Sequence, residues 1–243
     1  MAMITEDLPT NAADVLARDG FAVLPGPYPS AEFPRVQEAY DDACAQANRD
    51  DVRIGHASTR VTDFVNRGPM FDVIYTWPPA LEAARRVIKA PFRLSALHAR
   101  TLHSGAPAHE LHVDVPRTSD AWPMLGFILM VDEFRADNGA TRFVPGSQRR
   151  TELPENALTD RISPYSGETL ACGPAGSVIL FDASTWHGHT ANRSEAGRRS
   201  LQGTFIPRTG RPATDFAARM QPETCARLTD VARGLLGIDA RPA

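Results

Sequence analysis

From residue 92 onward, the chain is a series of short apolar segments separated by turn residues. The segments span residues 94–102, 109–115, 124–131, 140–145, 177–181, 185–191 and 199–206. Turn-forming sequences such as Asn138-Gly139 and Pro145-Gly146 lie between them. Segments of this length and spacing predict the β-strands of a sandwich or barrel. The 20 prolines among 243 residues agree with this prediction, because proline interrupts helix interiors and is common in turns.

The two ends of the chain have a more helical pattern. Helices are predicted at residues 12–19, 30–48, 81–89 and 214–236, and a short strand at residues 21–24. Asn11 and Ser30 are suitable N-caps for the first two helices, and Gly20 is suited to end the first. Residues 51–69 lack periodicity and are predicted to form an irregular loop.

No proline-rich hinge, internal repeat or low-complexity segment divides the sequence, so we expect one domain over residues 1–243. Within it, residues 1–91 are expected to form a mostly helical flank and lid. Residues 92–208 are expected to form the β core, and residues 209–243 a C-terminal helical tail.

Charge and composition exclude several classes of protein. The 26 Lys and Arg residues against 29 Asp and Glu residues give a net charge of −3, so no basic excess is available for nucleic acid. No apolar run approaches the ~20 residues needed to span a membrane, and the first residues do not resemble a signal peptide. We therefore expect a cytoplasmic protein. Its three cysteines, far apart and without a CxxC pair, argue against a disulfide framework or a structural zinc site.

The first candidate for chemistry is His112-Val113-Asp114. Residues i and i+2 of a strand point to the same face, so this imidazole and carboxylate would lie side by side. Such a pair chelates first-row metals, and His187, 75 residues downstream, offers a third ligand from another segment. Taken alone, the motif is weak evidence, because a polar pair at a strand end is the commoner explanation.

Three further features strengthen the metal-site hypothesis. Residues 138–147 predict a turn, a strand and a second turn, and residues 176–182 predict a buried strand that leads directly to His187. Arg198 follows His187 by eleven residues and can lie on the next strand, facing the same interior. A guanidinium in that place would bind a carboxylate through two parallel hydrogen bonds.

Together these motifs resemble the phytanoyl-CoA dioxygenase family of iron(II)- and 2-oxoglutarate-dependent oxygenases. The resemblance covers residues 94–206 in order and spacing, and residues 18–24 resemble the opening helix-to-strand turn of the family. It implies a mainly β fold with flanking helices (α+β), with a double-stranded β-helix core (jelly roll, cupin-like) and the N-terminal and C-terminal helices packed outside. One departure is Gln148, where the family commonly has histidine; we expect it on an outer turn with little consequence.

The resemblance also implies roles for individual residues. His112, Asp114 and His187 would be the iron ligands, and Arg198 would bind the distal carboxylate of 2-oxoglutarate. His189, two residues after His187, would be a further contact for the co-substrate.

The strand that precedes the metal motif offers other candidates. Thr101 and His103 share one face of this strand, where either could contact the co-substrate, although a surface position is the alternative. His109 has the opposite parity to His112 and is expected to be structural. Arg142 and Arg117 could contact an acidic substrate, but both are expected to be solvated. Residues 60–66 are the candidate lid.

The implied function is oxidation of a small organic molecule by Fe(II), 2-oxoglutarate and O2, with release of succinate and CO2. Halogenating relatives have a small residue in place of the ligand carboxylate, so Asp114 favours hydroxylation; desaturation, ring formation and epimerisation remain alternatives. Two other classes stay open: a cupin-like metalloenzyme without a keto-acid, and a non-catalytic jelly-roll binding protein. The substrate and the oligomeric state are not predicted.

Overall fold

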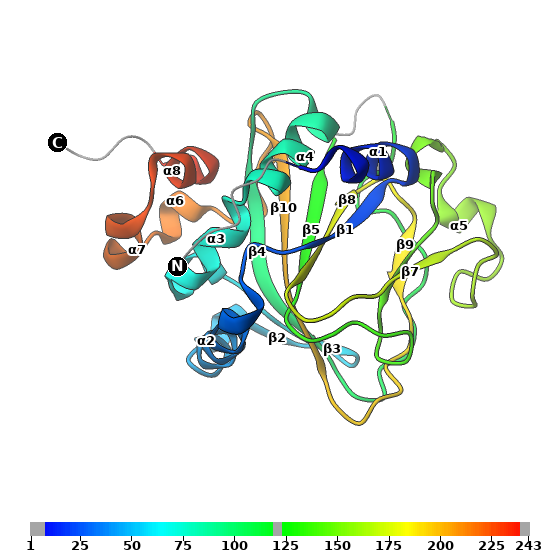
Figure 1. Ribbon diagram of the computed structural model, residues 1–243, viewed down its shortest axis with the longest axis horizontal. Helices are drawn as coiled ribbons and strands as arrows, with labels where there is room; N and C mark the ends of the chain where they lie inside the picture. Colours follow the sequence, from blue (N-terminus) through cyan, green and yellow to red (C-terminus); the bar gives the residue numbers. More distant parts are fainter. Residues whose placement is uncertain (1–7, 119–122, 239–243) are drawn as a thin grey trace.

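The computed structural model describes residues 8–118 and 123–238, and two antiparallel β-sheets form its centre (Figure 1). The larger sheet has, in spatial order, β1 (Phe21–Pro25), β8 (Ser177–Asp182), β5 (Leu125–Met130), β10 (Arg198–Pro207), β4 (Phe92–Leu102), β3 (Ser58–Val61) and β2 (Val52–Ile54). The smaller sheet has β7 (Thr169–Ala171), β6 (Thr141–Phe143) and β9 (His187–His189). This arrangement confirms the predicted mainly β jelly-roll fold with flanking helices.

The helices lie outside this pair of sheets. They are α1 (Thr10–Asp19), α2 (Phe33–Ala45), α3 (Asp72–Tyr75), α4 (Pro78–Ile88), α5 (Pro154–Ala157), α6 (Phe216–Arg219), α7 (Pro222–Arg227) and α8 (Asp230–Leu236). Short 3₁₀ turns are η1 (Ser30–Glu32), η2 (Arg49–Asp51), η3 (Phe64–Arg67), η4 (Pro69–Phe71) and η5 (Ser147–Arg149). In Figure 1, α2, α3 and the C-terminal helices lie on the side of the larger sheet opposite the smaller sheet. None of the described helices is both long and apolar enough to cross a membrane.

Alternation along the strands gives the larger sheet two different faces. On β10, Leu201 and Phe205 are completely buried and belong to the core beneath the helices. Arg198, Ser200 and Gln202 have the opposite parity, so they face the smaller sheet. The helical face therefore provides stability, and the face between the sheets is free to carry polar groups.

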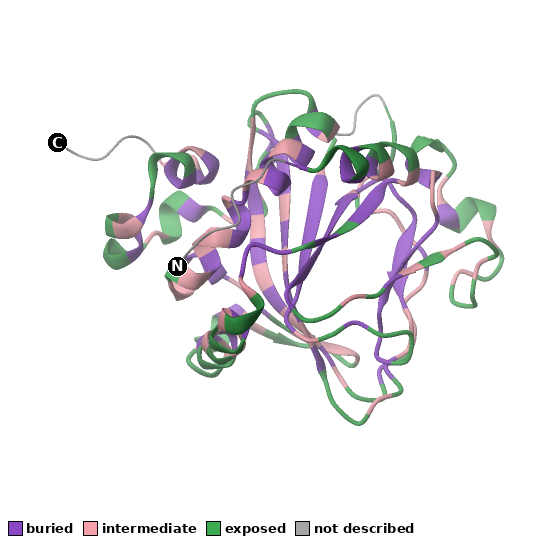
Figure 2. Ribbon diagram, in the orientation of Figure 1, coloured by how far each residue is buried: buried purple, intermediate pink, exposed green. Residues whose placement is uncertain are grey.

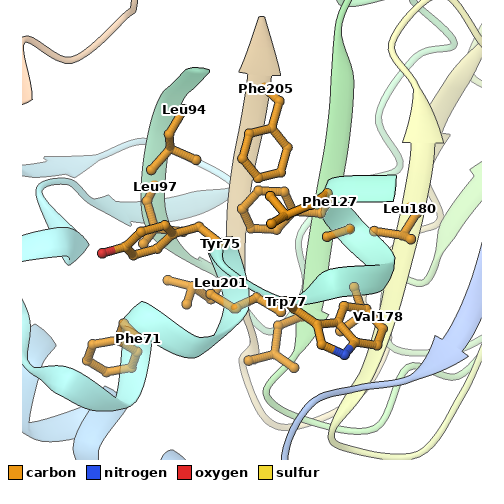
Figure 3. Packing of buried hydrophobic residues seen from close by; sticks show 14 of the residues in the cluster. Phe71, Tyr75, Trp77, Leu94, Leu97, Phe127, Val178, Leu180, Leu201 and Phe205 are labelled. Carbon is orange, nitrogen blue, oxygen red and sulfur yellow. The ribbon is translucent and has the colours of Figure 1, made fainter. Parts of the chain in front are cut away.

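The main core lies between the helices and the larger sheet (Figures 2 and 3). In Figure 3, Tyr75 is drawn near Leu97 and Leu201, and Trp77 near Val178. All five residues are 2% exposed or less. Complete burial of such side chains contributes roughly 1.5–3 kcal/mol each. A second apolar cluster lies between the sheets and contains Phe21, Ile128, Met130, Phe134, Ala140, Phe143, Ala171, Ile179 and Phe181.

Two predicted regions differ from the structure. Residues 51–69 are not simply a loop, because β2 and β3 form a hairpin whose second strand pairs with β4. Residues 109–115 do not form a strand; only the isolated bridge between His112 and His187 is present. The N-terminal flank thus contributes three strands to the larger sheet, since β1 also belongs to it.

The predicted helices are present with altered ends. Gly20 ends α1 in the left-handed conformation (φ 85°) and donates its N–H to the Leu16 carbonyl, as expected. Asn11 lies inside that helix rather than capping it. The second helix begins at Phe33, after the turn that starts at Ser30. The tail forms three short helices instead of the one or two expected, and the first break lies at Pro222, which cannot continue a helix that begins before it.

Candidate metal centre and active site

Three side chains from distant parts of the chain converge between the two sheets. The metal-ligating atoms of His112, Asp114 and His187 all lie within 4.8 Å of one another. Each histidine Nε2 is 3.7 Å from one oxygen of Asp114. Two nitrogen donors and one carboxylate oxygen, grouped on one side, match the facial set that holds non-haem Fe(II).

Backbone hydrogen bonds orient both imidazoles. The Nδ1 atom of His112 is 3.0 Å from the Glu110 carbonyl, and that of His187 is 2.9 Å from the Thr185 carbonyl. A carbonyl only accepts, so each Nδ1 must carry the proton, which leaves each Nε2 lone pair directed at the centre. Burial lowers the pKa of His187, against the opposing effect of Asp114, and this favours the neutral form that binds metals.

The surrounding elements fix the positions of these ligands. His187 begins β9, and its backbone exchanges two hydrogen bonds of 2.9 Å with His112. The rings of Phe143 and Phe181 lie 5.7 and 5.0 Å from the His187 ring and form an apolar wall behind it. His112 and Asp114 remain about one-third exposed, so the candidate centre is open on one side.

That open side faces a cavity of about 470 Å³. Its wall includes all three candidate ligands together with Arg198 and His189. The structure thus brings together five of the six residues predicted for the site.

Arg198 is a buried cation whose hydrogen bonds are incomplete. It is only 3% exposed, and its Nε and Nη1 atoms have no hydrogen-bond partner within the described part of the chain. Its guanidinium carbon lies 4.0 Å from the centre of the Phe134 ring. Burial lowers its pKa to about 9, which still leaves it charged at neutral pH. A buried charge of this kind requires an anionic partner, so the position fits the carboxylate of 2-oxoglutarate.

His189 and His109 form a stacked pair beside the centre. Their ring centroids are 5.3 Å apart, and His109 also lies edge-on to His112 at 4.6 Å. Burial lowers the pKa of His189 to about 3 and that of His109 to about 4, so both are neutral. The expectation that His109 faces away is wrong, because alternation holds only within a strand and residue 109 precedes the isolated bridge in irregular backbone.

The position of Thr101 contradicts its predicted role as a co-substrate contact. Thr101 lies on the helical face of β4, where its hydroxyl is 3.4 Å from that of Tyr40, and it does not line the cavity. His103 is also outside the cavity lining; its Nε2 is 2.9 Å from the Thr59 hydroxyl. The inner face of β4 instead carries His98 and Arg100, which sequence parity alone did not identify.

Two further predictions about polar residues are wrong. Arg142 is 2% exposed rather than solvated and donates to the carbonyls of His109, Arg161 and Ser163. Gln148 is 4% exposed rather than peripheral, and its amide donates to the carbonyl of Ala17 at the end of α1. Arg117, in contrast, is exposed as expected, with Asp182 3.9 Å away.

The family model for phytanoyl-CoA dioxygenase (PhyH) matches residues 16–200 of the chain. The chain belongs to the phytanoyl-CoA dioxygenase family. This confirms the family resemblance found in the sequence, and the match includes the candidate metal ligands and Arg198.

Relatives of known sequence agree with this assignment. The chain is 28% identical over 216 residues to "Dioxygenase trt7" of Aspergillus terreus, a match that covers 82% of this chain and 73% of that protein. It is 35% identical over 122 residues to "Dioxygenase cdmA" of Talaromyces verruculosus, covering 45% of this chain and only 37% of that protein. Family membership and these relatives support an Fe(II)- and 2-oxoglutarate-dependent dioxygenase, the predicted enzyme class.

A solved structure supports the fold. HygX from Streptomyces hygroscopicus, crystallised with nickel, 2-oxoglutarate and hygromycin B bound, superposes with a TM-score of 0.68 at 17% identity. The superposition covers 84% of this chain and 90% of that chain. At this identity the likeness establishes the common fold, and the site must be argued from the residues of this chain.

Proposed function

We propose that the protein uses Fe(II), 2-oxoglutarate and O2 to oxidise a small organic molecule, most simply by hydroxylation. His112, Asp114 and His187 would hold the iron. Arg198 would bind the distal carboxylate of 2-oxoglutarate, with His189 beside it. The observation that carries the proposal is the meeting of a two-histidine, one-carboxylate set with a buried, incompletely paired guanidinium in a single cavity.

The residues present fit these groups. His112, Asp114 and His187, grouped on one side, would hold Fe(II) and leave its remaining positions open to the keto-acid and to oxygen. When bound, the iron and the keto-acid supply the oxidising chemistry, in which 2-oxoglutarate is converted to succinate and CO2.

The residues of the chain orient the metal ligands, keep water from one side of the centre and offer hydrogen bonds to the co-substrate. The Glu110 and Thr185 carbonyls hold the two imidazoles in the metal-binding tautomer. Phe143 and Phe181 keep water from the back of His187. The Nδ1 proton of His189 is donated to the Thr190 carbonyl, so its Nε2 presents a lone pair to the cavity. His189 therefore binds a carboxylate only if it is protonated, and otherwise accepts a hydrogen bond from a donor.

Anaerobic titration with Fe(II) tests the proposal directly. We expect a visible absorption band that needs both Fe(II) and 2-oxoglutarate, and succinate formation once O2 is admitted. Arg198→Ala should weaken 2-oxoglutarate binding by about 100-fold, because it removes charge-assisted hydrogen bonds of about 1.5–3 kcal/mol each. Arg193→Ala, which removes an exposed arginine from the connection between β9 and β10, is the matched control and should have no effect on 2-oxoglutarate binding.

The same experiment separates the alternatives. A cupin-like enzyme without a keto-acid would bind Fe(II) but show no band that depends on 2-oxoglutarate. A non-catalytic jelly roll would bind neither ligand, and its melting temperature would not rise when both are added. The cytoplasmic location stays a prediction.

A further inference from the structure

Two arginines besides Arg198 face each other in the wall of the cavity. Arg100 lies on the inner face of β4, and Arg60 is its direct cross-strand partner on β3. Cβ atoms of directly opposed residues in an antiparallel pair are ~4.5–5.5 Å apart, and like charges in such positions repel each other. Arg60 is exposed at the cavity entrance, whereas Arg100 is half-buried further inside.

Neither guanidinium has an acidic partner within residues 8–118 and 123–238. Neither forms an ion pair there, and the buried Nε of Arg100 has no hydrogen-bond partner. Burial and the charge of Arg60 both lower the pKa of Arg100, whereas Asp114 raises it. Arg199, one position after Arg198 but on the outer face, contrasts with this pair because it is bound by both Asp132 and Asp41.

The iron and the co-substrate do not neutralise this pair. Fe(II) with Asp114 carries one net positive charge, and the 2-oxoglutarate dianion with Arg198 carries one net negative charge. The charges of these four groups therefore sum to zero. The described residues that line the cavity include no charged side chains besides Asp114, Arg198, Arg60 and Arg100, if the histidines are neutral. Two positive charges therefore remain in the loaded site.

The part of the cavity lining near β5 and β8 has a different character. Met124, Ile128 and Phe181, from β5, β8 and the segment before β5, present apolar side chains. Gln202, Ser95 and Thr204 add uncharged polar groups on the arginine side. The cavity lining is thus more apolar near β5 and β8 and cationic near β4 and β3.

We infer that Arg60 and Arg100 bind an oxyanion of the primary substrate, a carboxylate or a phosphate ester, whose apolar body lies against Phe181 and Ile128. The inference deepens the proposed function and rests on it, since it assumes that 2-oxoglutarate occupies Arg198. Two adjacent guanidiniums offer parallel N–H donors to one oxyanion, and its charge removes their mutual repulsion. The β2–β3 hairpin, joined to His103 through Thr59, presents Arg60 at the entrance.

Binding to the loaded but inactive protein tests the inference. With Ni(II) and saturating 2-oxoglutarate present, calorimetric titrations would use 4-phenylbutyrate, 3-phenylpropyl phosphate and methyl 4-phenylbutyrate as probes. We expect at least one acidic probe to bind ten times more tightly than the neutral ester. Whichever acidic probe binds more tightly shows whether the site prefers a carboxylate or a phosphate. The preference should decrease with added salt, because screening weakens the attraction.

Variants connect this preference to the two residues. Arg100→Gln and Arg60→Gln should each reduce the affinity for the acidic probe by about 10-fold or more, with the ester unchanged. Arg100→Lys should restore part of the affinity, since it keeps the charge. Arg35→Gln removes an exposed arginine from α2 and is the matched control. The exposed position of Arg60 makes its variant the safer one for folding.

The outcomes separate the two hypotheses. If Ni(II) and 2-oxoglutarate do not bind to the wild-type protein, the proposed function is wrong. If they bind but acid and ester have equal affinity, or no acidic probe binds, the inference is wrong. A variant of either arginine that weakens only 2-oxoglutarate binding would also overturn it, because the pair would then serve the co-substrate.

Discussion

The chemistry of single residues in this protein depends on hydrogen bonds to backbone carbonyls. Carbonyls fix the tautomers of His112, His187 and His189. Backbone carbonyls also hold Arg142, whose guanidinium donates hydrogen bonds to three of them and lies 3.2 Å from Glu168. One of these carbonyls belongs to His109, so Arg142 supports the segment that places His109 beside the metal centre.

Replacement of Arg142 by methionine tests this support. The change removes one donor from three carbonyls and from Glu168, although the Arg161 carbonyl and Glu168 each keep a backbone donor. Loss of one partner of a buried charge pair costs about 3–5 kcal/mol. We expect the free energy of unfolding in urea to fall by that amount. Arg149→Met, which removes a less buried arginine that donates to carbonyls of α1, should have a smaller effect. Equal losses in the two variants would contradict the assigned role.

Pairs of strands use glycine to accommodate aromatic rings on both faces of the larger sheet. Gly126 lies opposite Phe181 on the cavity face, and Gly203 lies opposite Phe127 on the helical face. A Cβ atom on either glycine would lie 2.2 Å from the facing ring. The two pairs therefore pose the same steric problem, but only the ring of Phe181 lies against His187.

The variants Gly126→Ala and Gly203→Ala form a matched experiment. Each forces a ring to move and should destabilise the protein by about 1–3 kcal/mol in denaturant unfolding. Only Gly126→Ala should also weaken metal binding, by about tenfold, because the displaced Phe181 ring presses on His187. Ni(II) titration measures this difference. Equal metal affinity in both variants would show that Phe181 does not help to position the ligand.

On the scale of the whole molecule, partly buried ion pairs attach the C-terminal helices to the N-terminal flank. Asp51 is 4% exposed and lies 2.9 Å from Arg67 and 2.5 Å from Arg219. Arg227 of α7 lies 2.8 Å from Asp72 of α3. Neither contact includes a residue that lines the cavity, so we expect both to contribute to stability rather than to chemistry.

Asp51→Asn tests this separation between the stabilising side and the cavity. The variant leaves the nearly buried Arg67 without its carboxylate and should lower the free energy of unfolding by about 3 kcal/mol. Its affinity for Ni(II) and 2-oxoglutarate should match that of the wild type. Arg85→Gln, which breaks an exposed pair with Glu82 on α4, should change neither quantity measurably. A large loss of 2-oxoglutarate affinity in Asp51→Asn would contradict the separation.

Local sequence determined the strands at residues 94–102, 124–131 and 177–181 and the stop of the first helix at Gly20, because periodicity and turn chemistry are properties of short segments. The order and spacing of His112, Asp114, His187 and Arg198, together with the turns and strands at residues 138–147 and 176–182, predicted the family and the candidate metal site.

Tertiary structure alone decided which face of each strand lines the cavity. Alternation places Arg100 and Thr101 on opposite faces of β4 but does not show which face lines the cavity. The pairing of β4 with β10 and β3 decides this. The β2–β3 hairpin, the stacking of His109 and the burial of Arg142 likewise depend on contacts between distant segments. Such contacts are set by the register of whole strands and the packing of two sheets, and no local pattern encodes them.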